Sequence, residues 1–159
     1  MKPLLLAAVL VVMPAHAQER ASLVTNQVRI TGEVQHELTF TVDNLRSFSK
    51  GRVSAAERGY AGVRLTDLLR EANIRQDARY ALRRTYVVAT ASDGYQAVFS
   101  WAELFNTPVG RGVLVAYERD GEPLRDGEGR IALVSLADER SGTRHVKWLR
   151  SIEVRRVPE

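Results

Sequence analysis

The chain has 159 residues, of which 45% are hydrophobic and 26% are charged, and its 23 basic and 19 acidic side chains give a formal net charge of +4. This composition is typical of a globular protein and excludes a disordered or collagen-like chain. No cysteine is present, which excludes disulfides, thiolate metal sites and cysteine nucleophiles within the chain. Basic and acidic residues are interspersed, as in residues 118–120, so we expect a mixed solvated surface and no nucleic-acid partner.

The first 17 residues predict a secretory signal peptide. Lys2 precedes the apolar run of residues 4–13, and Ala15-His16-Ala17 forms an A-x-A cleavage site before Gln18. The run is too short for a bilayer crossing, which needs about 20 residues. We therefore expect cleavage near Ala17, a periplasmic or secreted protein that does not span a membrane, and one domain over residues 18–159.

The N-terminal half contains signals for two strands and one helix. Residues 28–34 and 38–42 each alternate apolar and polar side chains with period two, which predicts two short strands joined by a loop. Leu65–Ala72 places its apolar residues at helical spacing along one face. We expect an amphipathic helix there, ending near Asn73.

A hairpin followed by a helix is predicted in the next segment. Two β-prone runs, residues 86–92 and 95–99, flank Asp93-Gly94, which predicts a type I′ turn in which both turn residues have positive φ. Ser100 is followed three residues later by Glu103, which predicts a capping box at the start of a short helix.

The remaining segments are predicted to be mostly strands. Residues 113–119 precede a second Asp-Gly turn at 120–121, and Pro123 limits the return strand to a short edge piece. Residues 131–134 and 151–155 have the composition of two further strands. The fold class is therefore α+β, a single compact domain of mixed short β-strands with two or three short helices.

Motifs for phosphate-binding loops, nucleophile elbows and metalloprotease helices are absent from the sequence. Two histidines follow the signal peptide, His36 and His145, and neither has a second ligand at metal spacing, so we expect no metal site. The carboxylate of Asp93 could serve acid–base chemistry, but an Asp-Gly turn also explains it.

The densest polar cluster spans residues 140–148. Arg144, His145 and Lys147 lie beside two hydroxyl residues and Gly142, and such a loop could bind an anion through its charges and backbone N–H groups. The alternative is an exposed basic loop before the last strand.

Six motifs in fixed order give the chain a resemblance to a known family. It resembles the sulfite-oxidase-type molybdopterin-binding domain over nearly all of residues 18–159. The motifs are Val28-x-Ile30-x-Gly32-x-Val34, Leu38-Thr39-Phe40-Thr41-x-x-x-Leu45, Tyr60-x-Gly62-Val63-x-Leu65-x-x-Leu68-Leu69, Ala91-Ser92-Asp93-Gly94-Tyr95, Asp120-Gly121-Glu122-Pro123-Leu124 and Lys147-Trp148-Leu149-x-x-Ile152-Glu153-Val154.

The resemblance implies a mixed α+β fold that holds molybdenum on a pterin dithiolene and transfers oxygen atoms, oxidising sulfite or reducing sulfoxides. By this resemblance, Asp93 and Tyr95 would approach the metal pocket, and Arg144, His145 and Lys147 would lie near the pterin phosphate.

One departure from the family decides which function the sequence favours. The family ligates molybdenum with a cysteine thiolate before the Tyr-x-Gly-Val motif, whereas this chain has residues 49–58 without cysteine, where Ser54 would be a hard, protonated oxygen. The sequence favours a non-catalytic module that has lost the metal ligand and binds a small anion or a protein partner, with no catalytic residue assigned and molybdopterin implied by resemblance only. The alternatives are a molybdopterin-dependent oxidoreductase of the sulfite oxidase type and a purely structural exported domain.

Overall fold

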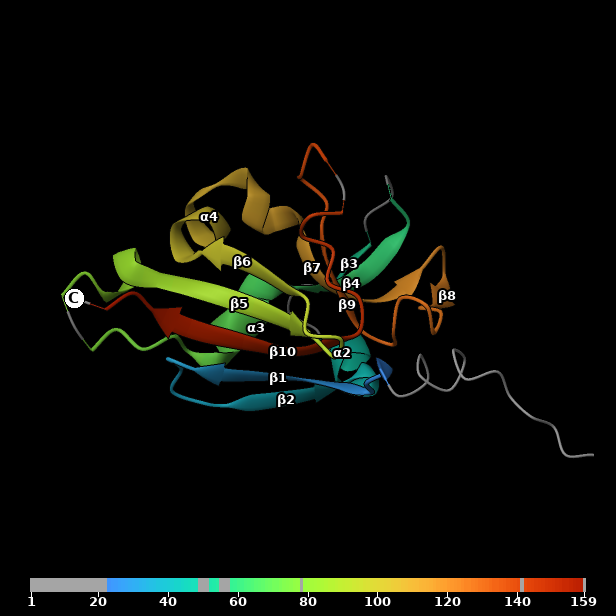
Figure 1. Cartoon of the computed structure of the whole chain (residues 1–159), viewed down its shortest axis with the longest axis horizontal. Coiled ribbons are helices and arrows are strands. Elements are labelled where there is room, and N and C mark those ends of the chain that lie inside the picture. Colours follow the sequence, from blue (N-terminus) through green and yellow to red (C-terminus); the bar gives the residue numbers. More distant parts are fainter. Residues whose placement is uncertain (1–22, 49–51, 55–57, 78, 141, 159) are drawn as a thin grey trace, which may run out of the picture.

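The computed structural model describes residues 23–48, 52–54, 58–77, 79–140 and 142–158. The predicted signal peptide lies outside these residues. Two five-stranded sheets make up the fold (Figure 1). The first has the order β2-β1-β10-β5-β6, with the bounds β1 (Gln27–Gly32), β2 (Leu38–Thr41), β5 (Thr85–Ala91), β6 (Gln96–Ser100) and β10 (Leu149–Arg156). The second has the order β3-β4-β7-β8 with β9 also on β7, and the bounds β3 (Arg52–Ser54), β4 (Tyr60–Arg64), β7 (Val113–Arg119), β8 (Glu122–Pro123) and β9 (Ala132–Ser135).

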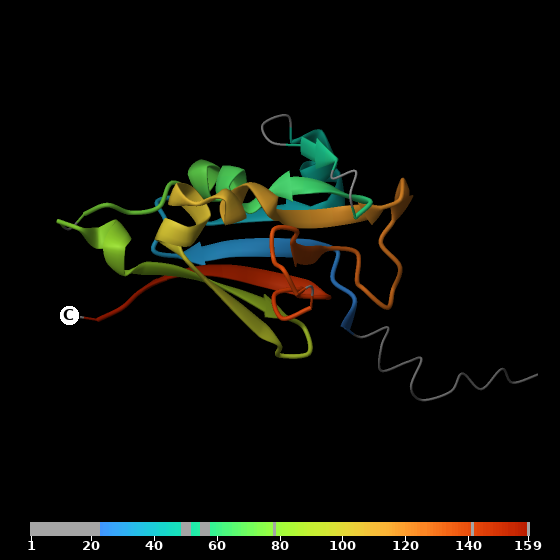
Figure 2. The same ribbon diagram turned by 90° about the horizontal axis from the view of Figure 1, so that it is seen from above.

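Short helices connect the two sheets. They are α2 (Val42–Ser47), α3 (Leu65–Ala72) and α4 (Trp101–Asn106), together with the 3₁₀ turns η1 (Ala81–Arg84) and η2 (Pro108–Gly112). Seen from above, α3 and α4 lie in one layer with β4 and β7, and β1, β5, β6 and β10 form the other (Figure 2). Among the described residues, no helix is long and apolar enough to cross a membrane.

The central strand β7 is buried on both faces and so separates two apolar clusters. Val113, Val115 and Tyr117 point into the main core, which lies between the layers and also contains the apolar faces of α3 and the first sheet. Leu114 and Ala116 point the other way, into a smaller cluster on the outer face of the second sheet. That smaller cluster supports the candidate site described below.

The α+β fold class and the amphipathic helix are confirmed. Helix α3 has the bounds that its apolar spacing predicts, and Asn73 ends it in the left-handed conformation with φ of 57°. Helix α2 was not predicted from the sequence. The strand predicted over residues 38–42 ends at Thr41, and the helix begins at the next residue, Val42. Thr41 caps the new helix by accepting a hydrogen bond from the Asn44 backbone N–H, and the Asn44 side chain accepts one in return.

The two Asp-Gly turns differ, and the predicted type I′ turn at residues 93–94 is wrong. At 120–121 both residues have positive φ, 53° and 82°, as a type I′ turn requires. At 93–94 only Gly94 has positive φ, 89°, and the Ala91 backbone N–H donates to the Tyr95 carbonyl at 2.9 Å, which closes a loop of residues 92–94. The reason is local hydrogen bonding, since the Asp93 carboxylate accepts from the Tyr95 backbone N–H at 2.9 Å and stabilises the alternative turn.

Candidate functional site

An open cavity of about 720 Å³ lies on the outer face of the second sheet. We call it the basic cavity, because five of its lining side chains are arginine or lysine and only two are carboxylates. Its floor includes the buried Tyr60 and Val134 of the smaller apolar cluster. The charged and titratable lining residues are Arg58, Tyr60, Arg119, Arg125, Glu128, Asp138, Arg144, His145 and Lys147.

Two loops form the wall of the basic cavity, and Trp148 joins them. Its backbone N–H donates to the Glu128 carbonyl at 2.9 Å, and its indole Nε1 donates to the Asp126 carbonyl at 2.8 Å. Gly129 makes this approach possible, because a Cβ at that position would lie 2.8 Å from the Trp148 Cα. The 125–129 loop is therefore held against the 144–148 segment by backbone contacts.

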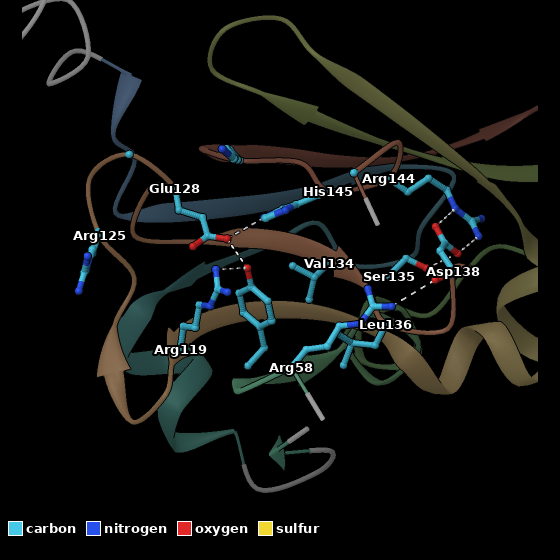
Figure 3. A pocket seen from close by; sticks show the side chains of 14 residues that line it. Arg58, Arg119, Arg125, Glu128, Val134, Ser135, Leu136, Asp138, Arg144 and His145 are labelled. Atoms are coloured by element: carbon cyan, nitrogen blue, oxygen red, sulfur yellow. Dashed lines mark hydrogen bonds and ion pairs between the residues drawn. The ribbon is translucent and has the colours of Figure 1, made fainter. Parts of the chain in front are cut away.

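Glu128 is the centre of one polar cluster in the cavity (Figure 3). The Tyr60 hydroxyl donates a hydrogen bond to its carboxylate, and His145 Nε2 lies 2.8 Å from the same oxygen, Oε1. Arg119 Nη1 in turn donates to the Tyr60 hydroxyl at 3.3 Å. The Glu128 Oε1 atom therefore accepts a hydrogen bond from Tyr60 and lies within ion-pair distance of His145.

Burial sets the protonation states in this cluster. It raises the pKa of Tyr60 to about 12, with the bond to Glu128 acting in the same direction, so the hydroxyl keeps its proton and donates. It also lowers the pKa of His145 from its usual 6.5, and the charges of Lys147 and Arg119 add to this effect while Glu128 opposes it. The imidazole is therefore neutral at pH 7.

Arg144 forms the second polar cluster, on the opposite side of the cavity (Figure 3). Its Nε donates to Asp138 Oδ2 at 2.8 Å, its Nη2 donates to Asp138 Oδ1, and its Nη1 donates to Glu103 Oε1 at 2.5 Å. The guanidinium also lies over the Phe99 ring, 4.7 Å from its centroid. These hydrogen bonds hold the pKa of Asp138 below its usual value and raise that of Arg144.

The contact with Arg144 explains why the predicted capping box at α4 is only half formed. Ser100 Oγ accepts from the Glu103 backbone N–H at 3.0 Å, as predicted. The Glu103 carboxylate reaches Arg144 instead of the backbone of Ser100. A charged partner outcompetes the backbone N–H because charge-assisted hydrogen bonds are the stronger ones.

The structure brings together three of the five predicted site residues. Arg144, His145 and Lys147 line the basic cavity, whereas Asp93 and Tyr95 do not. Asp93 accepts from the turn backbone, and the Tyr95 hydroxyl donates to the Thr143 carbonyl at 2.7 Å. Tyr95 therefore braces the loop that carries the three cavity residues.

Sequence reasoning missed most of the lining residues. Tyr60 stood in a family motif, but nothing in that motif indicates that its hydroxyl reaches Glu128. Glu128 and Asp138 lie in polar loops with no local pattern, and only the tertiary fold brings them to Tyr60 and Arg144.

Two cations of the basic cavity have no partner among the residues that the structure describes. The side chains of Arg125 and Lys147 are exposed and make no hydrogen bond or ion pair with any described residue. Within the described part of the chain, the Arg58 side chain makes a long hydrogen bond of 3.4 Å to the Asp138 carbonyl and lies near enough to the Asp138 carboxylate to help lower its pKa. Both lining carboxylates are already bound, so the charge that the cavity can offer a ligand is positive.

The comparisons with known proteins agree with the fold. A family model described as an oxidoreductase molybdopterin binding domain matches residues 49–159. The fold is similar to that of the sulfane dehydrogenase SoxCD from Paracoccus pantotrophus, with a TM-score of 0.59 and 22% identity over 80% of this chain and 37% of that chain. The chain thus spans less than two thirds of that structure. No curated protein sequence matches the chain significantly.

We expect Arg144 to be needed for stability. Arg144→Gln removes a two-pronged bond to Asp138, whose side chain is only 11% exposed, and we expect the free energy of unfolding to fall by about 1.5–3 kcal/mol. Arg130→Gln is the matched control, because its ion pair with Asp126 is exposed and should contribute no more than about 1 kcal/mol. Urea denaturation measures both, and equal losses in the two variants would contradict the role given to Arg144.

The lowered pKa of His145 predicts a pH dependence of stability. Below pH 6.5 the unfolded chain takes up a proton at this residue while the folded chain does not, so the free energy of unfolding should fall as the pH drops from about 7 to 5. The lowered pKa of Asp138 also stabilises the fold, but this contribution is lost only below the usual pKa of 3.8. It therefore does not affect the comparison between pH 7 and 5. Denaturation curves at several pH values should give a smaller slope for His145→Gln, and an unchanged slope would refute the prediction.

Proposed function

Because the chain belongs to the family of oxidoreductase molybdopterin-binding domains and yet contains no cysteine, we propose that it is a non-catalytic module that binds an organic anion in the basic cavity. The observation that carries the proposal is the pair of unpartnered cations, Arg125 and Lys147, beside two carboxylates that are already bound. A ligand with a negative group would supply the missing partner.

The side chains of the basic cavity do not fit a molybdenum centre. The family's metal ligand is a thiolate, and the described lining residues offer only nitrogen and oxygen atoms. Residues 49–51 and 55–57, in the segment where the family carries its cysteine, lie outside the described residues, but the sequence there holds no sulfur. His145 and Glu128 could ligate a metal but contact each other. We derive no oxygen-transfer step for this chain.

The size and floor of the cavity indicate which anion it fits. About 720 Å³ is within the range of sites for small organic molecules, roughly 300–1,000 Å³, and is large for a bare inorganic ion. Tyr60, Val134 and Leu136 supply apolar and aromatic surface next to the cations. The ligand class is therefore an organic body that carries a phosphate, sulfonate or carboxylate group.

Export is part of the same proposal. The charged and apolar pattern of residues 1–17 and its A-x-A site support a periplasmic or secreted location after cleavage near Ala17. The ligand would then be an anion that this compartment contains.

Phenyl phosphate tests the proposal, with phenol as its uncharged control. We expect calorimetry to detect binding of phenyl phosphate only, and Lys147→Gln or Arg125→Gln to weaken that binding about tenfold, because each removes one charged contact. Arg150→Gln is the matched control, since Arg150 is exposed, unpartnered among the described residues and outside the cavity. Equal affinity for phenol and phenyl phosphate, or unchanged binding by Lys147→Gln, would contradict the proposal.

A further inference from the structure

A second pocket lies at the start of helix α3. We call it the α3 pocket; it has a volume of about 290 Å³ and is lined by Arg64, Thr66, Arg70 and Arg111 together with parts of residues 104–110. No carboxylate is among its described lining residues. It shares no lining residue with the basic cavity.

Three polar groups in the α3 pocket have no partner among the described residues. The Arg64 Nε is buried without an acceptor, and the side chains of Arg64 and Arg111 make no hydrogen bond or ion pair. Thr66 is only 5% exposed, yet its hydroxyl makes no hydrogen bond either. Buried polar groups are almost always satisfied, so the buried Arg64 Nε and the nearly buried Thr66 side chain, beside the exposed cation of Arg111, indicate an absent acceptor.

The backbone of α3 adds further donors at the same place. The residue before the helix, Arg64, provides no side-chain cap, so its side chain accepts no hydrogen bond from the first backbone N–H groups of α3. Asp67 lies in the first turn, but its carboxylate pairs with Arg70 at 2.6 Å. The positive end of the helix dipole therefore adds to the charges of Arg64 and Arg111.

Gly110 places Arg111 at this pocket. A Cβ at position 110 would lie 1.6 Å from the Leu104 carbonyl oxygen, so only glycine lets η2 pack directly on the backbone of α4. That contact brings Arg111, the next residue, to the pocket that Arg64 and Thr66 line. The positive charges of Arg64 and Arg111 are thereby held around the α3 pocket. Their repulsion destabilises the fold unless a bound anion compensates it.

We propose that the α3 pocket binds a small tetrahedral oxyanion of the phosphate or sulfate class. Arg64 and Arg111 neutralise its charge, and the Thr66 hydroxyl and the first N–H groups of α3 donate hydrogen bonds to its oxygens. The volume suits a small ion better than the organic ligand proposed for the basic cavity.

Titration of the ¹⁵N-labelled chain with inorganic phosphate at constant ionic strength tests this site. We expect saturable shifts of the Thr66 and Asp67 amides, and at least tenfold weaker binding in Arg111→Gln, whose exposed side chain can be replaced without disturbing the core. Thr66→Val should also weaken binding, and Arg150→Gln should leave it unchanged. Parallel titrations with sulfate and with O-phosphoserine distinguish a free ion from a phosphate ester as the preferred form.

Three results would overturn the proposal. These are shifts that do not saturate, identical affinity in Arg111→Gln, and shifts confined to residues 142–147 of the basic cavity. The last result would leave the proposed function intact and remove only the second site, so the two hypotheses can fail separately.

Discussion

The ion-pair cluster around Arg144 holds the candidate site together. Its guanidinium joins Glu103 of α4 to Asp138, in the turn after β9, and covers the ring of Phe99 in β6. These contacts connect both sheets to the segment that carries His145 and Lys147. Because all three guanidinium nitrogens donate to carboxylates, Arg144 positions the wall of the cavity, and its charge is already compensated. The charges that we propose for ligand binding are instead Arg125 and Lys147, which have no partner among the described residues.

The sequence predicted those elements correctly whose stability depends on side chains close together in the chain. The stripe of α3, the cap Ser100 and the turn at residues 120–121 all depend on neighbours within four residues. The turn type predicted at residues 93–94 was wrong. Asp-Gly occurs in more than one turn type, and here the hydrogen bond from the Tyr95 backbone N–H to the Asp93 carboxylate favours another type. The site was only partly predictable because its contacts are not local. Glu128 and Tyr60, for example, are 68 residues apart in the sequence. Arg144, His145 and Lys147 were found because they lie together in one loop.

Both proposed sites follow from charge that the fold leaves uncompensated. In the basic cavity the two carboxylates are bound by Tyr60 and Arg144, and no carboxylate is among the described residues that line the α3 pocket. The fold of the family is retained while the sulfur ligand is absent, and this combination is the basis of our proposal that the chain binds an anion without catalysis.

The molybdenum and pterin content of the chain tests this account most directly. The chain should be purified after export from a host that makes the cofactor, and its metal measured by elemental mass spectrometry beside the fluorescence of released pterin. The account predicts neither molybdenum nor bound molybdopterin, because the cavity lacks the soft ligand that the metal requires. One molybdenum atom per chain would contradict it and would make the chain a molybdopterin-dependent oxidoreductase with a cysteine-free ligand set.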